Sequence, residues 1–517
     1  LTSTAQVNKP KLAVQKKSLS LSEKRKKLAE QKKQKKATKQ NLKANNPSQE
    51  QLTSLLEHYQ NGRFDDAEKL SVSVTQEFPK HQFSWKVLGA VLKQTGRVSE
   101  SLVANQKSVQ LAPQDANAHS NLGVTLKELG RLGEAEASYT QAIAIKSDYA
   151  EAHYNLGIML QELGRLDEAE ASYTQAIALK PDYAEAHSNL GITLKELGRL
   201  DEAIWAYMQA LKINPDFTDA YNNMGMILTG IVFKKSVPGL SELICEFLTK
   251  KTLVRPNDIS KAVISLLKFD PTIKGTIRKN FAGELLQSLQ KIIVGLSNVP
   301  LLLKLMETCP IPDLEFESLF KNIRSAILLS ISNIKNNSEI LGFQIALALH
   351  CFTNEYLYDQ TNIEIEALEE LENLVYNKLT ARKQPTPTEL ACLASYKALY
   401  KYSWIQLITF PVELQALQCR QIIEPEEEKK LRGKIPILQE INNNISRNVR
   451  EQYEQNPYPR WINTRLRLTP KSISAFTKEI NLNIKNSSIN EIRNPQILIA
   501  GCGTGQDSIG TAASFKD

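Results

Sequence analysis

The sequence lacks the features that mark a membrane-spanning or exported protein. None of its apolar runs reaches the roughly 18 residues that a membrane-spanning helix requires. The amino terminus is basic and polar, without the apolar core of a secretory signal. We therefore expect a cytoplasmic protein with no membrane span.

Cysteine and histidine patterns that bind metal are also missing. The 6 cysteines are scattered without a CxxC pair, and the 6 histidines do not cluster with them. Zinc sites need closely spaced groups of these ligands, so we expect no metal. Scattered cysteines in a chain of 517 residues also suit a reducing compartment.

Charge is distributed unevenly along the chain. Residues 1–50 contain 14 Lys or Arg against 3 Asp or Glu, whereas residues 51–517 contain 50 and 53. With almost no large apolar side chains, residues 1–47 are predicted to form a disordered basic tail. The tail is either an arm attracted to nucleic acid or an anionic surface, or a solvated, partly helical leader. No aromatic residues alternate with its lysines, so base stacking is not indicated.

A repeat with a period of about 34 residues dominates the region 48–230. Small residues and tyrosines recur at the same spacing as a glycine, and prolines close most repeats. This spacing is the tetratricopeptide pattern, which predicts an α-solenoid of helix pairs. We count five repeats over about 48–217 and a last helix at about 218–230. The recurring glycines are Gly89, Gly123, Gly157, Gly191 and Gly225.

Each recurring residue has a packing role in this interpretation. The glycine and the small alanines let the two helices of a repeat approach closely. The tyrosine (for example Tyr139) fills the gap between neighbouring repeats, and proline ends the second helix. Histidines recur with the same period, at positions 119, 153 and 187. They would lie too far apart to share a metal, so we expect structural residues on the helix surface.

The stacked repeats predict a concave groove that binds a protein or peptide partner. Two residues before the glycine, four successive repeats have asparagine. This row of asparagines resembles the asparagine ladder of O-linked N-acetylglucosamine transferase, in which amides hold a peptide backbone. An amide suits that role because it offers both a hydrogen-bond donor and an acceptor. Alternatively, the asparagine is a consensus residue kept in recent repeat duplications. Two lysines would meet acidic groups of a ligand, so the predicted groove residues are Asn121, Asn155, Asn189, Asn223, Lys127 and Lys195.

Residues 231–450 lose the repeat but keep apolar residues at helical spacing, with breaks at prolines. We expect a second, mostly helical domain. His350 and Cys351 are adjacent there, which suggests a nucleophile and its base. Neighbouring helix residues point about 100° apart, however, so a core histidine and a buried thiol are the better interpretation.

A different pattern begins near residue 451. Gln496-Ile-Leu-Ile-Ala-Gly-Cys-Gly-Thr-Gly-Gln-Asp507 predicts a short buried strand, a glycine turn and then a helix. The dinucleotide pattern GxGxxG is not met, because its third glycine would fall at Gln506. GxGxG after an apolar strand instead resembles motif I of the class I S-adenosylmethionine-dependent methyltransferases.

Several segments together resemble bacterial tetratricopeptide-repeat methyltransferases. They are the repeats, Cys351-Phe-Thr-Asn-Glu-Tyr356, Tyr453-Glu-Gln-Asn-Pro-Tyr-Pro-Arg-Trp461 and the glycine turn. The resemblance implies a cofactor site for S-adenosylmethionine and a fold that is mainly α, with the first β-α unit of a Rossmann-like domain at 451–517. Ile499 departs from the broader class, in which an acidic residue is common. The implied cofactor residues are Gly501, Cys502, Gly503, Gly505 and Gln506, and Tyr458, Arg460 and Trp461 would form either a flap over the cofactor or a contact between domains.

The chain ends before a methyltransferase domain would be complete. Asp517 follows soon after Gly505, before a second strand and the acid that holds the cofactor ribose. No catalytic residue is therefore assigned, and we expect a fragment that is inactive by itself. The main interpretation is a repeat-containing methyltransferase whose repeats bind a protein or peptide. The alternative is a non-enzymatic interaction scaffold with a vestigial glycine turn. A second alternative, a glycosyltransferase, is suggested by the asparagine ladder, but the sequence contains no recognisable nucleotide-sugar site.

Overall fold

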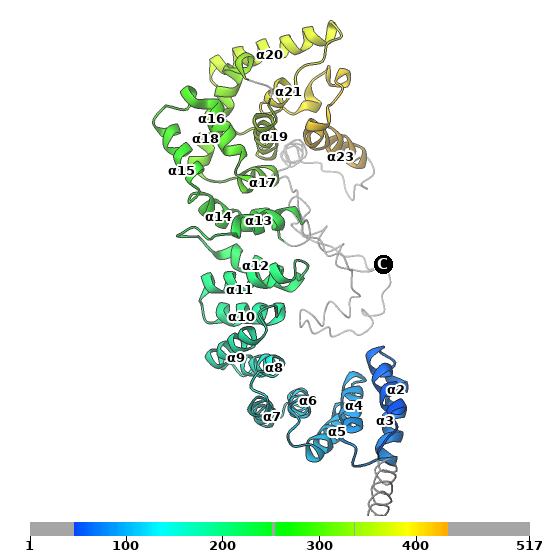
Figure 1. The fold of residues 1–517 in the computed structure, drawn as a ribbon. Helices are drawn as coiled ribbons and strands as arrows, with labels where there is room; N and C mark the ends of the chain where they lie inside the picture. The colour runs from blue at the N-terminus through cyan, green and yellow to red at the C-terminus, as the bar shows by residue number, and fades with distance from the viewer. Residues whose placement is uncertain (1–45, 251–253, 335–336, 433–517) are drawn as a thin grey trace, which may run out of the picture. The chain divides into compact units, whose positions relative to one another are not determined.

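The computed structural model describes residues 46–250, 254–334 and 337–432, and every regular element within these ranges is a helix (Figure 1). The described residues divide into two compact units, with the division between Thr193 and Leu194. The division falls inside one helix, α10. The predicted boundary between the repeats and the second helical domain, after residue 230, stays a prediction.

The first unit is a succession of helix pairs with the predicted period. Two helices of 12 to 14 residues alternate with short turns. The helices are α2 (Gln49–Gln60), α3 (Phe64–Glu77), α4 (Gln82–Gln94), α5 (Val98–Leu111), α6 (Ala116–Glu128), α7 (Leu132–Ile145), α8 (Ala150–Glu162), α9 (Leu166–Leu179) and α10 (Ala184–Glu196). The period continues in the second unit with α11 (Leu200–Ile213) and α12 (Thr218–Gly230).

The recurring glycine and tyrosine pack against each other inside one repeat. A Cβ atom at Gly123 would lie 2.7 Å from Cε1 of Tyr139, and one at Gly157 would lie 2.7 Å from Cε1 of Tyr173. Both tyrosines are buried. Each ring therefore covers the glycine of its own repeat, and the prediction that the tyrosine fills the gap between neighbouring repeats stays a prediction.

A second set of glycines shapes the turn between the two helices of a pair. Gly130 and Gly164 have φ of 72° and 73°, in the left-handed region where a Cβ atom is strained. Each directly precedes the arginine that begins the second helix. These glycines belong to the Glu-Leu-Gly-Arg-Leu stretch, so its repetition has a conformational cause.

One helix pair departs from the glycine–tyrosine pattern. In α5 the tyrosine position is Asn105, which is buried and would lie 2.3 Å from a Cβ atom at Gly89. Its amide donates to Thr125 Oγ1 at 2.9 Å and to Ser101 Oγ at 3.2 Å. A polar contact therefore joins α5 to the next repeat where the later repeats have an aromatic ring.

The second unit begins with the last repeat helices and continues as an irregular helical stack. Gly225 of α12 faces Val254 and Phe247, so the helices that follow cover the end of the repeat array. After α12, the helices of the second unit are α13 (Leu240–Thr249), α14 (Pro256–Leu267), α15 (Pro271–Phe281), α16 (Leu289–Ser297), α17 (Pro300–Thr308), α18 (Leu314–Leu329), α19 (Ser338–Thr353), α20 (Asn362–Thr380), α21 (Pro387–Ala394), α22 (Gln415–Gln418) and α23 (Glu424–Arg432), with short 3-10 and π turns between them.

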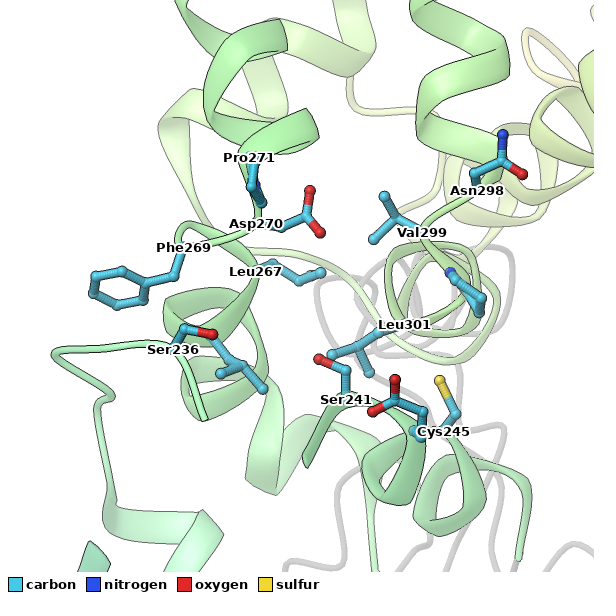
Figure 2. A pocket seen from close by; sticks show the side chains of 13 residues that line it. Ser236, Ser241, Cys245, Leu267, Phe269, Asp270, Pro271, Asn298, Val299 and Leu301 are labelled. Carbon is cyan, nitrogen blue, oxygen red and sulfur yellow. The ribbon is translucent and has the colours of Figure 1, made fainter. Parts of the chain in front are cut away.

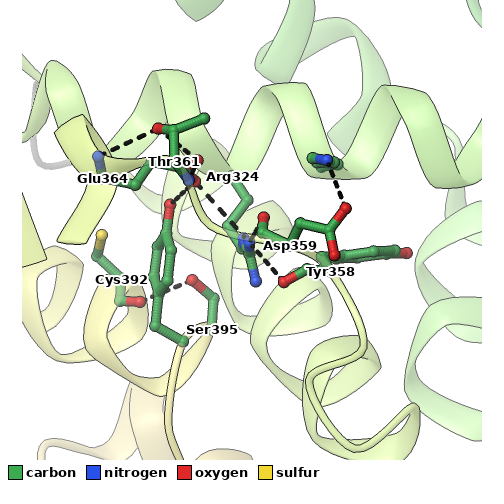
Figure 3. A network of polar contacts seen from close by, with 9 residues as sticks. Arg324, Tyr358, Asp359, Thr361, Glu364, Cys392 and Ser395 are labelled. Atoms are coloured by element: carbon green, nitrogen blue, oxygen red, sulfur yellow. Dashed lines mark hydrogen bonds and ion pairs between the residues drawn. The ribbon is translucent and has the colours of Figure 1, made fainter.

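A buried polar network lies among α18, α20 and α21 (Figure 3). The Arg324 guanidinium is 1% exposed and donates through Nη2 to the carbonyls of Tyr358 (3.2 Å) and Asp359 (3.0 Å). The same nitrogen lies 3.8 Å from Oε1 of Glu364, which is also buried. The hydroxyl of Tyr396 donates to that carboxylate at 2.8 Å, and its ring lies under the guanidinium.

None of the helices in the described residues is by itself long and apolar enough to cross a membrane. One bent pair, Leu286–Ser297 with Pro300–Thr308 at 86°, meets the length and composition criterion together. Its apolar side chains, including Ile293 and Leu302, are buried among neighbouring helices of the second unit.

Candidate functional site

The first helices of successive pairs form a continuous layer. Within the first unit, α2 contacts α4, α4 contacts α6 and α6 contacts α8, whereas the second helices of neighbouring pairs contact each other less. In a solenoid of helix pairs the more closely packed layer lines the concave side. We call the exposed side of α6, α8 and the start of α10 the inner face. Its characteristic polar residues are Asn121, Asn155, Asn189, Glu151 and Glu185.

The asparagines predicted to line a groove lie on this inner face. Among the described residues, the side-chain amides of Asn121 and Asn155 have no hydrogen-bond partner, and both side chains are half-buried. Asn189 uses only its amide nitrogen, which donates to the Tyr154 hydroxyl at 3.2 Å. The amides therefore keep donors and acceptors that a peptide backbone would satisfy.

Tyrosines flank the amides on the same face. The rings of Tyr154 and Tyr183 lie 4.8 Å apart, and burial raises the pKa of both hydroxyls. The Tyr154 hydroxyl bridges to Asn189, so the aromatic pair links α8 to α10. An aromatic surface beside free amides would pack against the side chains of a bound segment.

Carboxylates stand at equivalent positions of α8 and α10. Glu151 and Glu185 are exposed and form no ion pair with any described residue. Glu151 lies four residues before Asn155, and Glu185 four before Asn189, so each shares a helix face with its asparagine. Both contribute to the raised pKa of Tyr183, which places them near the aromatic pair.

The lysine predicted to meet acidic ligand groups has a partner inside the protein. Lys127 Nζ lies 2.8 Å from Oε1 of Glu162 on the next first helix. Lys93 makes the equivalent pair with Glu128 at 3.3 Å. These lysines join neighbouring repeats, which leaves the unpaired charge of the inner face negative.

Two of the predicted groove residues belong to the other compact unit. Asn223 lies on α12 and is half-buried, and Lys195 lies in the last turn of α10, beyond the division at Thr193. The structure therefore brings together Asn121, Asn155 and Asn189 on one face, while a role for Asn223 and Lys195 stays a prediction.

The recurring histidines close turns. Nε2 of His119 lies 3.0 Å from the carbonyl oxygen of Pro113, and Nε2 of His187 lies 3.2 Å from that of Pro181. Burial lowers the pKa of His187, which favours its neutral form. These contacts agree with the predicted structural role, but His187 is buried and does not lie on the helix surface as predicted.

The adjacent His350 and Cys351 are completely buried in the second unit. His350 Nε2 lies 2.8 Å from the Tyr358 hydroxyl, and burial lowers its pKa to about 4. Burial likewise raises the pKa of Cys351 to about 12, so its thiolate does not form near neutral pH. Both residues are part of the core, as the sequence predicts. The described residues contain no group of three or more His, Cys, Asp or Glu that could hold a metal.

A cavity of about 290 Å³ lies in the second unit, between the start of α13 and the α14–α15 and α16–α17 junctions. Asp270 and Val299 approach it from opposite sides, and Phe269 points away at its rim (Figure 2). Oδ1 of Asp270 accepts the backbone N–H groups of Thr272 and Ile273, so this carboxylate caps α15. The rest of the lining mixes apolar side chains with polar ones, among them Ser241, Glu242 and Cys245. Burial raises the pKa of the Cys245 thiol to about 11, so its thiolate does not form near neutral pH.

The residues implied for a methyltransferase site lie outside the described ranges. They comprise the glycine turn from Gly501 to Gln506 and the element containing Tyr458, Arg460 and Trp461. The predicted strand–helix unit at 451–517 and residues 1–45 of the predicted basic tail (1–47) also lie outside them. Cys351–Tyr356, the middle part of the resemblance, has a structural role: the Tyr356 hydroxyl donates to the carbonyl of Ala394.

Sequence reasoning missed the carboxylates and tyrosines of the inner face. Glu151 and Glu185, like Tyr149 and Tyr183, recur at the spacing of the repeat, which is the signal that could have found them. Whether these side chains are paired depends on the neighbouring repeat, however, and only the structure shows it.

Comparison with known proteins identifies the repeats. Residues 114–182 and 148–216 match the family model of the tetratricopeptide repeat. One similar solved structure is MamA, with 26% identity over 31% of this chain and 93% of that chain and a TM-score of 0.29. YrrB, a TPR protein with an unusual peptide-binding site, has 18% identity over 35% of this chain and 94% of that chain, with a TM-score of 0.30. TTC0263, a thermophilic TPR protein in Thermus thermophilus, has 28% identity over 35% of this chain and 98% of that chain, with a TM-score of 0.31. No curated protein matches the chain. Tetratricopeptide repeats are thus present in this chain, as the sequence predicts.

Proposed function

We propose that this protein is an interaction module whose inner face binds an extended peptide segment of another protein. The observation that carries the proposal is the pair of half-buried amides, Asn121 and Asn155, that have no partner among the described residues. Asn189 continues the row with one amide hydrogen bond. Polar groups at equivalent positions of successive repeats form a row along which an extended backbone can make repeated hydrogen bonds.

The packing of the repeats supports this proposal physically. Gly123 and Gly157 let each tyrosine of the second helix close over the first, so the helices that carry the amides are held by a tightly packed core. Groups fixed in this way lose little conformational freedom when a ligand binds. An amide hydrogen bond to a peptide contributes about 1 kcal/mol net, and several in a row give useful affinity.

A selection of displayed peptides on the full chain tests the proposal. Selected peptides should bind the N155A/N189A double variant about tenfold more weakly than the wild type, because two amide contacts are lost. The matched control is T140A/T174A, which alters equivalent exposed positions of the second helices α7 and α9. Equal affinity for the wild type and both double variants would refute peptide binding at the asparagines.

As a second candidate, we propose that the complete protein is an S-adenosylmethionine-dependent methyltransferase, to which the repeats bring a protein substrate. Only sequence supports this candidate: the strand and glycine turn from Gln496 to Asp507 and the Tyr453–Trp461 element. Gly501, Gly503 and Gly505 would lie against the cofactor. No catalytic residue can be named.

The coding sequence beyond codon 517 decides this second candidate. A reading frame that continues into a second strand ending in an acidic residue supports it, because that acid holds the cofactor ribose. A stop codon directly after Asp517 would rule it out and leave the interaction module.

A further inference from the structure

Acidic charge gathers in the repeats that form the inner face. Residues 46–114 contain seven acidic and seven basic residues, whereas residues 115–193 contain twelve acidic and five basic ones. Residues 115–193 therefore carry a net charge of −7, although residues 51–517 as a whole are nearly neutral.

Two of the carboxylates without an ion pair lie on the first helices that form the inner face. Asp148 and Asp182, in the turns before α8 and α10, and Asp167 on α9 also form no ion pair with a described residue. On the second helices, Glu134 and Glu168 are each paired with the arginine three residues earlier, at 2.7 Å and 2.5 Å between the charged atoms. Glu151 and Glu185 occupy the first turns of α8 and α10 and form no ion pair with a described residue. Helix polarity favours a carboxylate at all four positions, so it does not explain why only two of them are neutralised.

Three lysines of these repeats make contacts inside the protein. Lys127 is paired with Glu162, and Lys146 and Lys180 lie over the rings of Tyr149 and Tyr183, at 5.1 Å and 4.4 Å from the ring centroids. A ligand on this face therefore meets free amides, tyrosine edges and two exposed carboxylates about one repeat apart.

We propose that the inner face binds a segment of a partner protein that is rich in lysine and arginine; this rests on the proposed peptide-binding function and specifies its ligand. The free amides hold the backbone of the segment, and Glu151 and Glu185 attract its cationic side chains. Exposed charges act over about 10 Å at moderate ionic strength, so they select the sign of the ligand and speed its association.

Fluorescence anisotropy with the full chain and a labelled peptide of repeated Lys-Gln-Ala triplets tests the proposal. We expect E151Q/E185Q to weaken binding about fivefold, as two exposed charge pairs would. E134Q/E168Q removes the same net charge from the neighbouring second helices α7 and α9 and should leave the affinity unchanged. The corresponding Glu-Gln-Ala peptide should bind at least fivefold more weakly than the lysine peptide, and high salt should remove this difference.

Equal losses in the two double variants would overturn the proposal, because net charge alone would then explain binding. Equal affinity for the lysine and glutamate peptides would also overturn it. If N155A/N189A still weakened both peptides, the peptide-binding function would stand without a preference for basic ligands; if it weakened neither, that function would fail as well.

Carbodiimide cross-linking followed by mass spectrometry identifies the source of the lysines. We expect cross-links from Glu151 and Glu185 to the added lysine peptide. Cross-links to lysines within residues 1–45 of the same chain would overturn the assignment to a separate partner, because that stretch carries 14 basic and 2 acidic residues.

Discussion

The inner face of the first unit and the Arg324 network of the second use similar side chains in opposite ways. On the inner face, amides and carboxylates lack partners among the described residues and remain accessible to a ligand. Around Arg324, the buried guanidinium donates to two backbone carbonyls and lies near the Glu364 carboxylate, which also accepts a hydrogen bond from the Tyr396 hydroxyl. Polar groups that bind one another in a core stabilise the fold, whereas accessible polar groups without partners are available for recognition.

The largest expected effect is the loss of the buried arginine. R324M should lower the free energy of unfolding of the second unit by about 3–5 kcal/mol, because it leaves the Glu364 carboxylate buried without its cation. Urea unfolding followed by circular dichroism measures this change. The R324M/E364Q double variant should regain part of the stability; a loss below about 1 kcal/mol for R324M alone would show that the network is not structural.

A pH effect should also appear in the second unit. The folded pKa of His350 is about 4, so between pH 6.5 and 4 only the unfolded state takes up its proton. The second unit should therefore lose about 3 kcal/mol as the pH falls through this window, and keep this stability above pH 6.5. Unfolding free energies at several pH values test this expectation against an H350Q variant, whose slope should be smaller. Identical slopes would contradict burial of a neutral His350.

The first unit should depend more on glycine packing than on buried charge. G157A should lower its stability by about 1–3 kcal/mol, because the new Cβ atom would lie 2.7 Å from the Tyr173 ring. The control is G133A in α7, where a Cβ atom meets nothing within 4 Å and alanine should stabilise the helix by about 0.5–1 kcal/mol. Thermal unfolding measures both variants, and a neutral G157A would refute the close glycine–tyrosine contact.

The smallest expected effect concerns Lys127. Its ion pair with Glu162 is partly exposed, so K127Q should cost at most about 1 kcal/mol. Because the ammonium is already paired, K127Q should leave peptide affinity unchanged. A tenfold loss of affinity in the anisotropy assay would restore the role in ligand binding that the sequence predicts for this lysine.

The sequence alone predicts the repeat architecture well, because packing constraints recur with the chain. Gly123 and Gly157 stand out by spacing, and their close contacts with tyrosines agree with the physical reason inferred for a glycine there. The sequence also predicts where the asparagines lie along the helices. Which polar groups are paired is not a periodic property: Lys127 and Lys195 share a repeat position, but the partner of Lys127 comes from the following first helix.

The network around Arg324 could not be predicted from sequence for a related reason. Arg324, Glu364 and Tyr396 are separated by tens of residues in a region without a repeat, and only the packing of α18, α20 and α21 brings them together. Single polar residues in apolar helices give no indication of their partners. That His350 and Cys351 do not act as a base and a nucleophile was predictable, since neighbouring helix positions cannot face each other; the structure adds that both are buried.

The most direct test of the account compares stability and binding in one variant. N155A/N189A should lower the unfolding free energy of the first unit by at most about 1 kcal/mol, because only Asn189 has an internal hydrogen bond, to the Tyr154 hydroxyl. The same variant should bind selected peptides about tenfold more weakly. A loss of stability of about 2 kcal/mol or more with unchanged affinity would contradict the account, since the asparagines would then be structural residues of the repeats.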